Sequence, residues 1–126
     1  MLKIDLLSKE PIVEQVYRGI RHEIASGRIS AGQSLPTVRQ LAGDLGISLN
    51  TVARSYRLLE LDGLVNPIRG RGTVVADKEQ TESVKEMSEI RLRVELRNLL
   101  TSAKLAGWSK HKLDSVLKAE AKSLWK

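Results

Sequence analysis

Three polar side chains recur at helical spacing between residues 48 and 62, namely Asn50, Arg54 and Arg57. At about 100° per residue from Ser48, they project from one side of a helix. The opposite side carries a mostly apolar set that predicts a core face: Val52, Ser55, Tyr56 and Leu59. An asparagine amide pairs bidentately with adenine, and an arginine guanidinium pairs with guanine or a phosphate. The spacing therefore indicates a helix that could read base edges, with an ordinary solvated face as the other interpretation.

Short hydroxyl and basic residues surround this predicted helix. Ser48 and Thr51 belong to its first turn, where free backbone N–H groups favour anions and hydroxyls are suited to phosphate contacts. Arg39 lies in the first turn of the preceding helix. We expect Arg39 to contact phosphates or bases, and a local salt bridge to Asp44 or Asp62 is the competing explanation.

A second basic site occupies residues 69–72, with the sequence Arg-Gly-Arg-Gly. Glycine permits a tight turn and a close approach of backbone to a ligand. Arg69 and Arg71 could therefore follow a phosphate backbone or enter a minor groove, although arginine is also common at exposed hairpin tips. The complete set from which we expect DNA contacts is Thr37, Arg39, Ser48, Asn50, Thr51, Arg54, Arg57, Arg69, Gly70 and Arg71.

The helices and strands that position these residues can be predicted from helix-capping residues and from the glycines that end helices. Apolar residues at spacings of three and four predict a helix over 11–26. Thr37 and Gln40 fit a capping box that opens a short helix, which Gly46 ends. Ser48 caps a third helix to about residue 62, and two β-type runs, 64–68 and 73–76, form a hairpin. This order predicts a winged helix-turn-helix in residues 1–76.

Residues 77–126 are predicted to form a linker and two further helices, the first from residue 83 to about 106 and the second after Ser109. Two helices alone cannot bury their apolar stripes, and such exposed patches usually mark an interface. We expect this region to dimerise, with packing onto the winged domain as the alternative. The dimerisation residues are predicted to be Met87, Ile90, Val94, Leu96, Leu99, Leu113, Leu117 and Leu124.

Composition restricts the possible functions. The 126 residues carry a net charge of +6 and contain no cysteine, which favours nucleic acid as partner and removes thiol chemistry. No segment has the pattern of a signal peptide or a membrane span, so we expect a cytoplasmic protein without membrane contact. No nucleophile–base motif, nucleotide loop or metal-ligand spacing occurs, so we expect no enzyme activity, cofactor or metal.

Residues 10–76 resemble the N-terminal domain of the GntR family of bacterial regulators. The resemblance is carried by segments at fixed spacing: residues 32–39, 41–42, 45–48, 50–52, 63 and 70–75. Residues 50–56, followed by a tail of only about fifty residues, resemble the YtrA subfamily in particular. The resemblance implies dimeric operator binding, with DNA contacts from Arg39, Ser48, Asn50, Thr51 and Gly70.

Three leucines depart from this pattern. Leu49 stands where much of the wider family has arginine, which should shift base readout toward Asn50 and Arg54. Leu58 and Leu61 fall outside the core face, and they could pack on the wing, the linker or a second subunit.

The predicted fold is thus mainly α with a small β-hairpin: a winged helix-turn-helix plus a two-helix C-terminal dimerisation module. The predicted function is a sequence-specific regulator, a repressor that binds a palindromic operator as a homodimer. A winged-helix module for protein–protein interaction is the alternative. RNA binding is disfavoured because stacking aromatics are few. The operator, the regulated genes and any small-molecule effector stay open, and the short tail leaves little room for an effector pocket.

Overall fold

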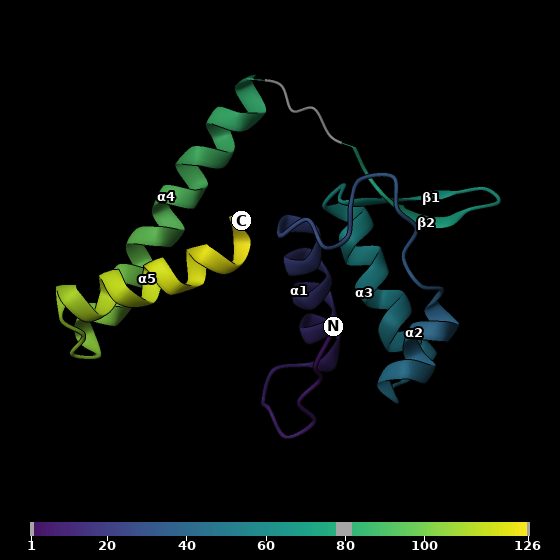
Figure 1. The fold of residues 1–126 in the computed structure, drawn as a ribbon, viewed down its shortest axis with the longest axis horizontal. Coiled ribbons are helices and arrows are strands. Elements are labelled where there is room, and N and C mark those ends of the chain that lie inside the picture. Colours follow the sequence, from purple (N-terminus) through teal and green to yellow (C-terminus); the bar gives the residue numbers. More distant parts are fainter. Residues whose placement is uncertain (1, 78–81, 126) are drawn as a thin grey trace. The chain divides into compact units, whose positions relative to one another are not determined.

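The computed structural model describes residues 2–77 and 82–125, and side chains of 82–85 are outside the description (Figure 1). The chain divides into two compact units, Met1–Lys78 and Glu79–Lys126. The elements, in chain order, are α1 (Ile12–Ala25), α2 (Val38–Leu45), α3 (Leu49–Leu61), β1 (Val65–Ile68), β2 (Gly72–Val75), α4 (Glu82–Leu105) and α5 (Lys110–Leu124). The predicted class, mainly helical with a hairpin after three helices, is confirmed, and α4 begins one residue earlier than expected.

The core of the first unit lies between α1, α2 and α3, beside the hairpin. Each helix contributes apolar residues spaced three or four apart, so each buries one face. Val16 and Val52 are completely buried, as is Leu59. The other buried apolar members of this cluster are Ile20, Ile29, Leu35, Leu41, Ala42, Tyr56, Val65 and Val75.

The turn between α2 and α3 is set by local chemistry. The predicted capping box is present: Thr37 Oγ1 accepts from the Gln40 amide, and the Gln40 side chain accepts from the Thr37 amide. Gly46 ends α2 in the left-handed region with φ of +67°. Ser48 then caps α3 by accepting from the Thr51 amide. These contacts determine where α3 begins relative to α2.

The hairpin pairs β1 with β2 in antiparallel register, with Val65 opposite Val75 and Ile68 opposite Gly72. Residues 32–35 run along the other edge of β2. The Gly32 amide donates to the Val75 carbonyl at 2.8 Å, and the Leu35 amide donates to the Thr73 carbonyl at 2.8 Å. The hairpin is therefore hydrogen-bonded to the segment that leads into α2.

The second unit consists of α4 and α5, joined by a turn in which Gly107 has φ of +86°. Ser109 caps α5 as predicted, because its hydroxyl accepts from the Lys112 amide at 3.0 Å. Among the described residues of α5, none is fully buried. No helix in the described part of the chain is long and apolar enough to cross a membrane.

Alanine substitutions at two glycines, one inside α2 and one at its C-terminal cap, are predicted to change stability in opposite directions. Alanine at Gly46 must adopt a left-handed conformation, so Gly46→Ala should lower the free energy of unfolding by about 1 kcal/mol. Gly43 lies inside α2, and a methyl group added at its Cα would lie in open space. Gly43→Ala should therefore raise the same quantity by roughly 0.5–1 kcal/mol. Urea denaturation of both variants measures this, and shifts in the same direction would refute the assigned cap geometry.

Candidate DNA interface

Helix α3 has one buried and one exposed face. The buried residues are those predicted: Val52, Ser55, Tyr56 and Leu59. Asn50, Arg54 and Arg57 are exposed on the opposite side, also as the helical spacing predicts. Among the described residues, none of these three side chains has a hydrogen-bond or ion-pair partner. The three polar groups of this face are therefore available to an external ligand.

Two buried hydroxyls attach the inner face of α3 to its neighbours. Ser55 is fully buried, and its Oγ lies 2.9 Å from the Val13 carbonyl of α1 and 3.0 Å from the Thr51 carbonyl. The Tyr56 hydroxyl donates to the Pro36 carbonyl at 2.6 Å, just before the cap of α2. Burial raises the pKa of Tyr56 to about 12, so the phenol keeps its proton at neutral pH. These bonds locate α3 relative to both α1 and α2.

A third contact joins α1 to the end of α3, and no local sequence pattern indicates it. The Tyr17 hydroxyl donates to Asp62, and the Arg21 guanidinium lies 5.4 Å from the centre of the Tyr17 ring. Burial, together with the Asp62 carboxylate, raises the pKa of Tyr17. The partners are 45 residues apart in sequence, which is why helical periodicity could not reveal the contact.

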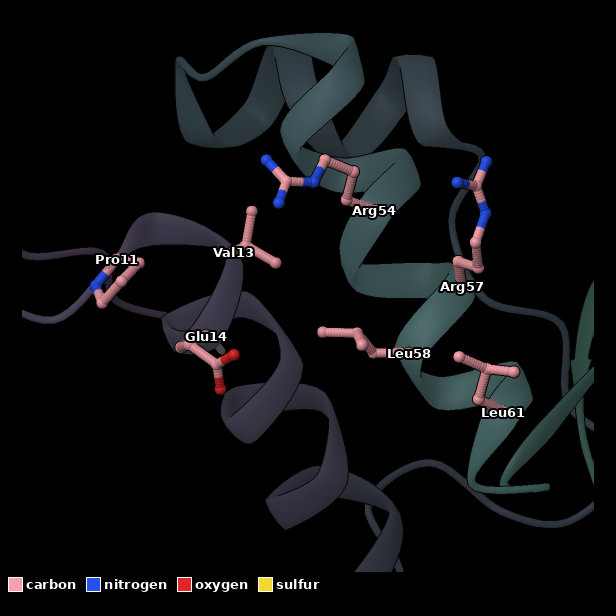
Figure 2. Close-up of a pocket in the computed structure, with 7 residues that line it drawn as sticks. All are labelled: Pro11, Val13, Glu14, Arg54, Arg57, Leu58 and Leu61. Atoms are coloured by element: carbon pink, nitrogen blue, oxygen red, sulfur yellow. The ribbon is translucent and has the colours of Figure 1, made fainter.

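A surface hollow of about 380 Å³ lies between the first turn of α1 and α3 (Figure 2). Arg54 points toward Val13 in this hollow, whereas Arg57 is directed away from α1. Leu58 is half-buried and faces α1, an element that the sequence did not indicate as its neighbour. Leu61 also lines the hollow but remains 78% exposed.

The predicted phosphate-contacting residues around α3 are exposed or half-buried. Ser48 and Thr51 share a hydrogen bond of 2.8 Å between their hydroxyls, and Thr37 forms the α2 cap. Arg39 is exposed at the start of α2. Among the residues that the structure describes, Arg39 forms no ion pair with Asp44 or any other carboxylate. The local salt bridge that competed with a DNA contact is therefore not formed within this part of the chain.

The wing tip contains two arginines in different environments. Gly70 has φ of +83°, the conformation that the third position of a type II turn requires. Arg69 is exposed and has no partner among the residues that the structure describes. Arg71 instead donates from Nη2 to the Gly32 carbonyl at 2.8 Å. The two arginines are equivalent in the sequence pattern, but their contacts in the structure differ.

The predicted dimerisation residues are mostly exposed in the isolated chain. Met87, Ile90 and Leu99 are 71%, 61% and 63% exposed. Val94, Leu96 and Leu117 are also exposed, whereas Leu113 and Leu124 are half-buried. Helix α4 therefore exposes several large apolar side chains.

The turn between α4 and α5 contains a surface hollow of about 370 Å³, although we expected little room for a pocket in this region. Its lining residues are Leu100, Ala103, Lys104, Trp108, Ser109, Lys110 and Leu113. Across the described residues, no group of three or more histidines, cysteines and carboxylates could hold a metal ion.

Comparison with known proteins agrees with this architecture. A family model, "Bacterial regulatory proteins, gntR family", matches residues 12–75. The chain is 33% identical to the HTH-type transcriptional repressor YtrA of Bacillus subtilis (strain 168), over 94% of this chain and 90% of that protein. The structure of YtrA from Sulfolobus acidocaldarius, a GntR-family transcription factor, matches with a TM-score of 0.64 at 33% identity, covering 79% of this chain and 97% of that chain.

A third match is the structure of AraR(DBD) in complex with operator ORX1, with a TM-score of 0.53 at 32% identity. It covers 60% of this chain and 93% of that chain. The family resemblance expected from the motifs is thereby confirmed, and the matched family consists of regulators rather than enzymes. The chain belongs to the GntR family of winged helix-turn-helix, DNA-binding transcriptional regulators and is a YtrA-like member of it.

Proposed function

We propose that the protein is a repressor that binds a two-fold symmetric operator as a homodimer, with α3 in the major groove. The observation that carries this proposal is the outer face of α3, where Asn50, Arg54 and Arg57 are exposed and unpartnered within the described chain. An unpartnered amide and unpartnered guanidinium groups can form hydrogen bonds with base edges and phosphates. A regulator of this kind acts where the chromosome is, which in a bacterium is the cytoplasm.

The roles of the contacting residues divide by position. Asn50 and Arg54 are both exposed on the first two turns of α3, where the Arg54 side chain reaches toward Val13, and they are assigned to base edges. Arg39 and Arg69 are exposed outside α3, and they are assigned to phosphates, which fix register without reading sequence. Thr37, Ser48 and Thr51 add hydroxyl or backbone contacts beside helix N-termini. The similarity to AraR(DBD), which was solved with its operator, supports this arrangement.

Dimerisation is proposed for α4 and α5 because of their apolar exposure. An α4 stripe containing Ile90 and Val94 would be covered by the same stripe of a second copy, since a two-fold interface pairs identical surfaces. Such a dimer presents two copies of α3, which matches a palindromic site with half-sites about one helical turn apart. Repression is supported by the similarity to the Bacillus subtilis repressor YtrA.

The assignment of α3 as reader predicts a loss of sequence preference. Asn50→Ala and Arg54→Ala should each cost roughly 1–3 kcal/mol per base contact and relax preference at one position of each half-site. The operator would come from sequencing genomic fragments that the protein retains, followed by titration of operator and scrambled duplexes. Arg18→Ala on α1 is the matched control and should bind as wild type does. If both α3 variants bind the operator with the affinity and sequence preference of the wild-type protein, the assignment of α3 as the reading helix is wrong.

The proposed dimer predicts that one added charge separates the protomers. Ile90→Glu should shift the molar mass measured by light scattering from that of two chains toward that of one chain. The reason is that burying an unpaired carboxylate in the interface is strongly unfavourable. Leu7→Glu is the control, since Leu7 is 95% exposed and lies outside α4 and α5. A wild-type monomer at micromolar concentration, or an Ile90→Glu dimer as stable as the control, would contradict the proposal.

A further inference from the structure

The wing is connected to α3 through a continuous series of contacts that pass through residues 32–36. Tyr56 of α3 donates to the Pro36 carbonyl at 2.6 Å, and Leu35 is buried in the core. The Leu35 and Gly32 amides both donate to carbonyls of β2. The segment of residues 32–36 is therefore attached to the recognition helix at one end and to the wing along its length.

Two bonds extend this attachment to the wing tip. Arg71 Nη2 donates to the Gly32 carbonyl at 2.8 Å, and Ser34 Oγ donates to the Arg71 carbonyl at 3.2 Å. Arg71 is thus bonded to the segment through both its side chain and its backbone. Arg69, two residues away on the same turn, makes no comparable contact among the described residues.

We infer that Arg71 is a positioning residue for DNA binding, and that Arg69 alone supplies the phosphate-contacting charge of the wing. This inference rests on the proposed DNA-binding role of the wing. By bonding to Gly32, Arg71 sets the distance between the wing tip and α3, the two elements that must contact one duplex together. Preorganising both elements lowers the cost of ordering them on binding. The sequence-based expectation that Arg71 meets phosphates is replaced by this role.

The contact itself can be tested without DNA by hydrogen exchange of backbone amides in the free protein. In Arg71→Ala, the Gly32 and Leu35 amides, which bond to β2, should exchange about tenfold faster because the segment opens more often. Arg71→Lys retains a long cationic donor and should recover much of the protection. Arg69→Ala is the matched control and should exchange as wild type does. Unchanged exchange in Arg71→Ala would overturn the inference whatever the DNA measurements show.

Salt titration of operator binding separates positioning from phosphate contact. Arg69→Ala should reduce the slope of log K against log salt by about 0.9 per protomer, or about 1.8 for the dimer. Arg71→Ala should weaken binding by about tenfold with the wild-type slope, and Arg71→Lys should restore affinity. An equal slope loss in both variants would make Arg71 a phosphate contact, and unchanged affinity would make it merely structural; either result overturns the inference. If the wild-type protein does not bind the operator, the proposed function is refuted. The hydrogen-exchange experiment would still test the Arg71 contact independently.

Discussion

The burial of one face of α3 against α1 is the constraint on which the rest of the binding surface depends. Val52 and Leu59 exclude water from this contact, and Ser55 places its hydroxyl against the Val13 carbonyl. A rotation of α3 about its axis would break that bond and bring the buried side chains of Val52 and Leu59 toward water, which is unfavourable for apolar groups. Because the inner face is fixed in this way, the outer face with Asn50 and Arg54 is fixed as well.

The exposed arginines are useful to a DNA-binding protein because the fold does not neutralise them. Ion pairs do occur on the described surface, for example Arg18 with Glu10 at 3.1 Å, so the chain can pair its arginines where it has acids nearby. Arg39, Arg54 and Arg69 have no such neighbours among the described carboxylates. Together with a net charge of +6, these free cations favour approach to a polyanion.

Features that depend on near neighbours in sequence were predicted well. The capping box of Thr37, the left-handed cap at Gly46 and the buried face of α3 all follow from residues a few positions apart. Contacts between distant segments were not predicted. The bond from Arg71 to Gly32 spans 39 residues, and Leu58 faces α1 because of how two helices pack. Periodicity states which face of a helix is buried, but not which element covers a residue at its margin.

The most direct test of α3 as the reading element is a map of the DNA contact on the intact chain, obtained from backbone amide chemical shifts during titration with an operator duplex. We predict that the largest shift changes occur from Ser48 to Arg57 and at Arg69 and Gly70. Amides of α4 should change little, because that helix is assigned to dimerisation. Changes concentrated in α4 and α5, with α3 unaffected, would contradict the claim that the outer face of α3 reads the DNA.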